Sequence, residues 1–122
     1  MNKILLFILL PAGILLLMSC AKVDEQEREN VGTLTLPIAS FYVSGNEGPA
    51  PATVQFHNTS EYSDQWVWTF HNGSTSGQFE PTYTYYNNTG EDKTFLVTLK
   101  AIDSNTGEYN IRSKSILIHP SK

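Results

Sequence analysis

One stretch, QWVWTFHNGSTS beginning at Gln65, constrains the fold more than any other part of the chain. Its three large aromatics, Trp66, Trp68 and Phe70, stand at alternate positions. Alternate side chains of an extended strand point to the same face, so we expect a strand with one aromatic, core-facing side. The Asn72-Gly73 dipeptide follows, and because Asn and Gly readily adopt positive φ it predicts a hairpin turn.

Short alternating runs continue through the rest of the chain from Pro37 onward, with Gly, Pro, Asn and Ser clustered between them. No segment of this region has the 3.6-residue period of a helix. About seven short strands at this spacing predict an all-β fold, an antiparallel β-sandwich. The clearest runs are Ala39–Val43, Val54–Phe56, Trp66–Phe70, Thr82–Tyr85, Phe95–Ala101 and Ile116–Ile118.

Aromatic and aliphatic residues of these runs supply the expected core. Aromatics at strand spacing are more often buried than used as a ligand platform, although both interpretations fit the tryptophan strand. The residues that we expect in the core are Phe41, Val54, Phe56, Trp68, Phe70, Tyr85, Val97 and Leu99.

The start of the chain has the pattern of a secretion signal. Lys3 gives a positive start, and Ile4–Met18 is almost wholly apolar. This apolar segment is too short and too poorly flanked for a stable membrane span. We therefore predict a signal peptide over residues 1–19, a segment over 20–36 that begins with Cys20 and continues as a tether, and a β-sandwich domain over 37–120.

The residues Leu17-Met18-Ser19-Cys20 resemble the lipobox of bacterial lipoproteins. The resemblance implies cleavage after Ser19 and attachment of diacylglycerol to the Cys20 sulfur. Cys20 is the only cysteine, so it cannot form an intramolecular disulfide; an incidental thiol is the alternative interpretation. The mature protein is thus expected to be held at a membrane by lipid without spanning it.

The segment after Cys20 is rich in charge and is expected to be a solvated tether. Ala21 differs from the Asp that commonly retains a lipoprotein at the inner membrane. Asp24, Glu25 and Glu27 resemble the acidic stretch of surface-exposed lipoproteins in Bacteroidetes, and the two resemblances imply an outer-membrane location. A spacer without sorting information fits the same residues.

Composition argues against a nucleic-acid partner. Without residues 1–19, the chain has 103 residues with seven basic and twelve acidic side chains, a net charge of −5, and no basic run. Binding to phosphates requires clustered Lys and Arg. The length suits a single small domain.

Five blocks of the domain have a characteristic composition: Ala39-x-Phe41, Pro51 to Asn58, Trp68 to Gly73, Pro81 to Tyr85 and Phe95 to Leu99. Their residues resemble the successive blocks of a PKD (polycystic kidney disease) domain, with similar spacing from Ile38 to Ile118. The resemblance implies a seven-stranded, immunoglobulin-like sandwich that serves surface proteins as a spacer, adhesion or ligand-binding module. The family signature W-D-F-G-D-G reads WTFHNG here, with Thr69 and Asn72 at its acidic positions, so we expect no calcium site and no cofactor.

Catalytic chemistry is not expected. His57, His71 and His119 are isolated in sequence and lack the spacing of metal ligands. Asp64 and Glu80 could be imagined as a glycosidase pair, but such a pair needs a deep cleft that a domain of this size does not provide.

The candidate binding surface is one end of the sandwich, where loops 59–64 and 103–109 are expected to emerge together. Aromatic rings beside polar groups are typical of a glycan or peptide contact surface, although both tyrosines could simply cover the end of the sandwich. A weaker candidate is the opposite end, with Tyr86, Asn87, Asn88 and the Asn72-Gly73 turn. The members of the first surface are Tyr62, Asp64, Gln65, Trp66 and Tyr109.

Two functions remain open from the sequence. The favoured one is a lipid-anchored binding or adhesion module for a protein or glycan at the cell surface. The alternative is a structural spacer or assembly subunit of an envelope complex without a soluble ligand, and a small hydrolase is the least favoured.

Overall fold

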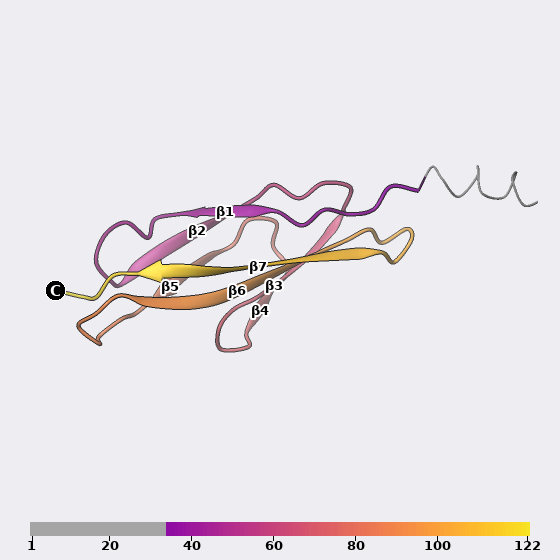
Figure 1. Ribbon diagram of the computed structural model, residues 1–122. Coiled ribbons are helices and arrows are strands. Elements are labelled where there is room, and N and C mark those ends of the chain that lie inside the picture. The colour runs from indigo at the N-terminus through magenta and orange to yellow at the C-terminus, as the bar shows by residue number, and fades with distance from the viewer. Residues whose placement is uncertain (1–33) are drawn as a thin grey trace, which may run out of the picture. The chain divides into compact units, whose positions relative to one another are not determined.

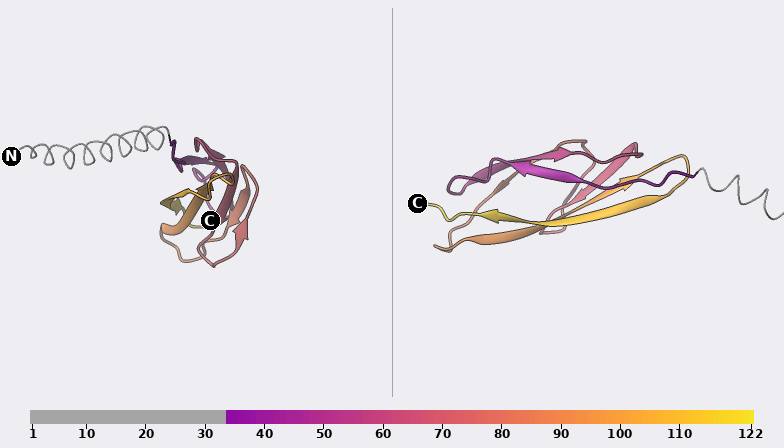
Figure 2. Two further views of the ribbon diagram at one scale, coloured as in Figure 1. Left: turned by 90° about the vertical axis from the view of Figure 1, so that its right-hand side faces the viewer. Right: turned by 45° about the horizontal axis from the view of Figure 1, so that its top comes forward.

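The computed structural model describes residues 34–122, of which Leu36–Lys122 form one compact unit. The predictions for the signal peptide, for Cys20 and for most of the tether lie outside the described residues. The unit is all-β, with two antiparallel sheets packed face to face (Figures 1 and 2). Its strands are β1 (Phe41–Ser44), β2 (Ala52–Asn58), β3 (Gln65–Thr69), β4 (Thr75–Ser76), β5 (Thr82–Tyr85), β6 (Lys93–Ile102) and β7 (Tyr109–Ile118).

The small sheet has the strand order β1-β2-β5, and the large sheet has the order β4-β3-β6-β7. The chain crosses from one sheet to the other three times, between β2 and β3, between β4 and β5, and between β5 and β6. This arrangement is the antiparallel sandwich predicted from the alternating runs, and it is immunoglobulin-like, as the resemblance to PKD domains implied.

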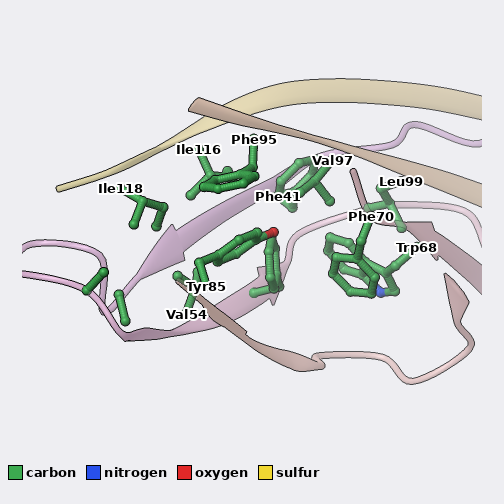
Figure 3. Close-up of a cluster of buried hydrophobic side chains, with 13 residues drawn as sticks. Phe41, Val54, Trp68, Phe70, Tyr85, Phe95, Val97, Leu99, Ile116 and Ile118 are labelled. Carbon is green, nitrogen blue, oxygen red and sulfur yellow. The ribbon is translucent and has the colours of Figure 1, made fainter. Parts of the chain in front are cut away.

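The core lies between the sheets and is built around Trp68, which is fully buried (Figure 3). Its ring centroid lies 5.1 Å from that of Phe41 and 5.3 Å from that of Phe56, and its indole N–H donates to the carbonyl of Gln78 at 2.9 Å. All eight residues expected in the core are buried, with exposed fractions of 5% or less. Burial of these large rings is a major apolar contribution to the stability of the domain, and the hydrogen bond of the indole N–H avoids the cost of a buried donor without a partner.

The predicted hairpin at Asn72-Gly73 joins β3 to β4. Gly73 has φ of 88° and donates to the carbonyl of Phe70 at 2.9 Å, and Phe70 donates to Ser74 at 2.9 Å. This is a type I turn closed by a residue in the left-handed region, a common three-residue hairpin loop. Strand β3 ends at Thr69, so Phe70 lies outside it but is still buried.

Strand β7 is longer than the run Ile116–Ile118 predicted. Its first half has polar residues at inward positions, so the apolar alternation that marks a strand is missing there. These residues bind the segment leading into β1: the Asn110 side-chain oxygen accepts from Ala39 N–H at 2.8 Å, and Lys114 Nζ donates to the Phe41 carbonyl at 2.5 Å. Polar contacts between strand edges therefore replace apolar packing along this side of the sandwich.

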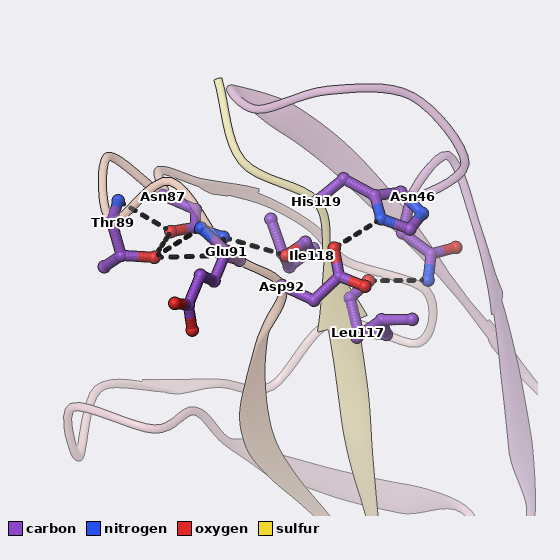
Figure 4. A network of polar contacts seen from close by, with 8 residues as sticks. All are labelled: Asn46, Asn87, Thr89, Glu91, Asp92, Leu117, Ile118 and His119. Carbon is purple, nitrogen blue, oxygen red and sulfur yellow. Dashed lines mark hydrogen bonds and ion pairs between the residues drawn. The ribbon is translucent and has the colours of Figure 1, made fainter. Parts of the chain in front are cut away.

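The chain enters and leaves the domain at opposite ends of the sandwich (Figure 1). At the entry end, Ile38 pairs with Glu61. At the exit end, Ser121 N–H donates to Asn87, while a His119–Asp92 contact of 2.8 Å and a bond from Asn46 to the Leu117 carbonyl tie the last residues to neighbouring loops (Figure 4).

Candidate functional site

The two loops expected at one end do lie together. Ser104 donates to Asp64 twice, from its N–H to Oδ1 at 2.9 Å and from its hydroxyl to Oδ2 at 2.5 Å. These hydrogen bonds, the side-chain one first, lower the pKa of Asp64 from its ordinary value near 3.8. Asp64 therefore acts as a charged link between the loops.

The five residues predicted for this end do not share one surface. Trp66 pairs with Ala101 on the core-facing side, and its indole N–H donates to the Ser63 hydroxyl at 3.1 Å. Its half-buried ring packs edge-on against Phe79 at 4.8 Å. Trp66 thus closes the end of the core, and it does not extend outward as part of an aromatic platform.

Tyr109 and Gln65 lie on the opposite face of the large sheet from Trp66. Both pair with Ile102, and Tyr109 belongs to β7, although it was expected in the loop 103–109. Tyr62 lies in the β2–β3 loop with a φ of 56° and a 59% exposed side chain. The predicted patch is therefore divided among a loop, the core and an outer sheet face.

The weaker candidate at the opposite end is also divided. Asn87 is 2% exposed, and its amide donates to the carbonyls of Ile118 at 2.9 Å and Glu91 at 2.8 Å, while its oxygen accepts from Thr89 (Figure 4). A side chain bonded on all sides is not available to a ligand. Asn72 lies in the loop between β3 and β4, and its side-chain amide donates to the Tyr83 hydroxyl at 3.1 Å.

The large sheet has an apolar outer face that was not among the surfaces predicted from the sequence. Pairing between β3, β6 and β7 places alternate residues on this face, opposite the buried ones, and five large hydrophobics on it are 37% to 56% exposed: Val67, Leu96, Tyr109, Ile111 and Leu117. We call it the outer face, and its members are Gln65, Val67, Thr69, Thr94, Leu96, Thr98, Lys100, Ile102, Tyr109, Ile111, Ser113, Ser115 and Leu117.

Charge is nearly absent from the outer face. Lys100 is its only ionisable side chain apart from the Tyr109 phenol, and no acidic residue belongs to it. The Lys100 ammonium lies 4.2 Å from the centroid of the Tyr109 ring, a cation–π contact that holds the charge against the sheet. The surface is therefore apolar and hydroxyl-rich, with one cation near one end.

The outer side of the small sheet is different, which makes the apolar composition specific to the large sheet. Tyr42 stacks on His57 at 4.5 Å, and His57 shares a 2.9 Å hydrogen bond with Ser44. Thr53 and Thr84 exchange a hydroxyl hydrogen bond at 2.9 Å. This side is polar, as expected for the solvent-facing side of an antiparallel sheet.

Among residues 34–122, no group of three or more His, Cys, Asp or Glu is placed to hold a metal ion. Asp64 is bound to Ser104, and Glu80 accepts from the Asn58 backbone N–H at 3.0 Å, so both carboxylates of the imagined pair have structural roles. Across the same residues, no helix has the length and apolarity needed to cross a membrane.

Comparison with known proteins identifies the fold. No protein-family model and no curated protein matches the chain. The PKD1 domain of Vibrio anguillarum Epp is similar in structure, with a TM-score of 0.55 and 21% identity over 70% of this chain and 96% of that domain. The PKD1 domain of the Vibrio cholerae metalloprotease PrtV has a TM-score of 0.55 and 25% identity over 70% of this chain and 99% of that domain. The chain therefore contains an immunoglobulin-like β-sandwich of the PKD type.

Proposed function

We propose that the mature chain is a lipid-anchored protein of the bacterial cell envelope whose PKD-like domain is a non-catalytic binding module. The anchor is supported by the lipobox-like residues ending at Cys20, and the module by the PKD-type fold. The binding role rests on one observation, the exposed hydrophobic side chains of the outer face. The side of an antiparallel sheet that faces solvent normally has polar side chains, and an apolar one marks an interaction surface.

A protein suits the outer face better than a glycan does. Glycan sites combine rings with converging carboxylate and amide groups. The outer face has one ring, one amide and no carboxylate, together with four exposed aliphatic side chains. Apolar side chains on a flat sheet are typical of a protein contact.

Anchoring is tested by Cys20→Ser in the full-length chain. The unchanged protein should incorporate a palmitate analogue and partition into the detergent phase, and the variant should do neither. A variant that still carries fatty acid would contradict lipidation at Cys20. Protease treatment of intact cells then reports the leaflet, since loss of the protein means outward display.

Binding is tested with a photo-reactive amino acid placed at Leu96, on the outer face, or at Thr84, on the polar side of the small sheet. Leu96 is 56% exposed, and Thr84 is also exposed. We expect a cross-linked protein product in intact envelopes from position 96 and none from position 84. Equal products from both positions, or none from either, would contradict the assignment of this surface.

The alternative, a spacer, is favoured by the positions of the domain ends. The chain enters at the end where Ile38 pairs with Glu61 and leaves at the opposite end (Figure 1). A spacer would span the distance between its two neighbours without lateral contacts. Variants of the outer face would then leave envelope assembly unchanged, whereas a binding module would lose its partner.

A further inference from the structure

We propose that the outer face binds the same face of a second copy of this chain, with the strands of the two copies antiparallel. The proposal rests on the binding role inferred above and names its partner. It starts from β6, in which both alternating sets of side chains include large apolar residues: Phe95, Val97 and Leu99 face the core, and Leu96 and Ile102 face outward. Strands with this composition are typical of sheets that are covered on both sides.

Electrostatics favours an identical partner over a charged one. A surface selected for an acidic partner would present several cations, but the outer face has Lys100 alone, and its ammonium is already placed over Tyr109. Two copies of a nearly neutral, acid-free face lose little solvation of charge when they meet, provided that the two lysines stay apart.

The strand register shows which arrangement keeps the lysines apart. Thr98 and Ser113 are paired near the middle of the face, and their hydroxyls share a 2.8 Å hydrogen bond. A two-fold axis that runs across the strands at this pair places each strand against the same strand of the second copy in the opposite direction. A residue on one side of the axis then meets the residue that lies equally far on its other side in the second copy. Lys100 then lies opposite Leu96 of the second copy, and the two lysines are four residues apart, or ~14 Å along the strand, so their repulsion is several times weaker than that of two directly opposed ammonium groups.

The same axis brings the ends of the face together favourably. Tyr109 and Leu117 lie four positions on either side of Ser113, so each Tyr109 ring would pack on the second copy's Leu117 side chain. A two-fold axis parallel to the strands would instead leave each residue at its own level along the strands, so that Lys100 of one copy would lie near Lys100 of the other. The antiparallel arrangement is therefore the one that the charge pattern allows.

The area of the face predicts a weak dimer. Two strands of ten residues and one of five, spaced ~4.8 Å apart with a rise of ~3.4 Å per residue, cover roughly 400 Å² per copy, or about 800 Å² for the pair. This is below the ~1,200 to 2,000 Å² of stable complexes, so we expect a dissociation constant of tens of micromolar or weaker in solution. Lipid anchoring would raise the local concentration and favour the dimer.

The first test uses Thr98→Cys in the full-length, membrane-anchored chain. A residue on the two-fold axis faces its own copy, so mild oxidation should give a covalent dimer. Thr84→Cys, which is exposed on the small sheet, is the matched control and should remain monomeric. A folded Thr98→Cys protein that gives no more dimer than the control would overturn the proposal.

The second test is sedimentation of the chain from residue 20 onward with Cys20→Ser, which retains the whole described domain and its core. We expect reversible association over ~10 to 500 µM, weakened at least tenfold by Leu96→Asp and unchanged by Thr84→Asp. A monomer at every concentration would overturn self-association. If the photo-reactive residue at position 96 nevertheless captured a different protein in cells, the binding role would stand with another partner; with neither result, both proposals would fail.

Discussion

Tyr85 provides a sharp test of the core, because its hydroxyl is buried without a hydrogen-bond partner among the described residues. The residue is 1% exposed, and its hydroxyl points into the cluster of core side chains (Figure 3). Its ring packs against Tyr83 at 4.7 Å and Phe95 at 4.8 Å. Burial, with a smaller contribution from Tyr83, raises the pKa of Tyr85 above its ordinary value of 10.0.

We predict that Tyr85→Phe stabilises the domain. A buried hydroxyl without a partner costs ~1 to 3 kcal/mol of desolvation, and Phe removes this cost while keeping the ring. The void left by one oxygen, of order 10 Å³, costs only ~0.2 to 0.3 kcal/mol at ~24 cal/mol per Å³. The net gain should be ~1 to 2 kcal/mol, equivalent to roughly 4 to 15 °C in the melting temperature of a domain of this size.

Urea unfolding followed by tryptophan fluorescence measures the change, since Trp68 is buried. Tyr83→Phe is the matched control: it removes a hydroxyl that accepts from Asn72 at 3.1 Å, so it should cost ~0.5 to 1.5 kcal/mol. A Tyr85→Phe variant that is less stable than the unchanged protein by 1 kcal/mol or more would refute the reasoning, because the hydroxyl would then have a stabilising partner.

The raised pKa gives the same substitution a pH signature. A tyrosine with a higher pKa in the folded state contributes stability that is present below pH ~10 and is lost as the pH rises, because the unfolded chain releases the proton first. Stability should therefore fall above pH ~10 more steeply in the unchanged protein than in Tyr85→Phe. Parallel pH profiles for the two proteins would contradict this expectation.

Three further predictions concern the core, the loops and the hairpin. Trp68→Ala should cost ~3 to 5 kcal/mol and leave the domain largely unfolded by circular dichroism; a soluble, cooperatively folding variant would contradict the role of this ring. Ser104→Ala should raise the pKa of Asp64 toward 3.8 in an NMR titration, so that the stability contributed by the charged carboxylate is lost at a higher pH on acidification; an unchanged pKa would show that the hydrogen bonds do not hold the charge. Gly73→Ala should cost ~1 kcal/mol in urea unfolding, because φ of 88° is strained for Ala although its Cβ meets no atom; a neutral change would contradict this account.

The fold was predictable wherever local chemistry and packing agree. Trp68 and Phe70 stand at strand spacing and are buried, and Asn72-Gly73 lies in the predicted hairpin turn, where Gly73, unlike Asn72, has positive φ. The β7 boundary was not predictable in the same way. Asn110 and Lys114 point inward but bind the backbone at Ala39 and Phe41, and a partner 71 to 73 residues away leaves no periodic signal.

The candidate site was harder to predict than the fold. A surface formed by side chains from three strands depends on register, and the position of Tyr109 within β7 decides that it lies on the opposite face from Trp66. One signal was present in the sequence: Leu96 and Ile102 interrupt the alternation of β6 with apolar residues on its outward positions. Such a strand has two apolar faces, which distinguishes a covered sheet from a solvated one.

The edges of the large sheet explain why association would use the outer face. Strand β7 is an edge strand, and an open edge invites pairing with another chain. Here the side-chain amide of Asn46 donates to the Leu117 carbonyl at 3.0 Å, so this carbonyl is not free to pair with another strand. Arg112 and Lys114 place charge at inward positions of β7, a recognised protection against edge pairing. A contact through a face closes after two copies, whereas edge pairing could continue into fibres, so the blocked edge and the apolar face together favour a discrete dimer.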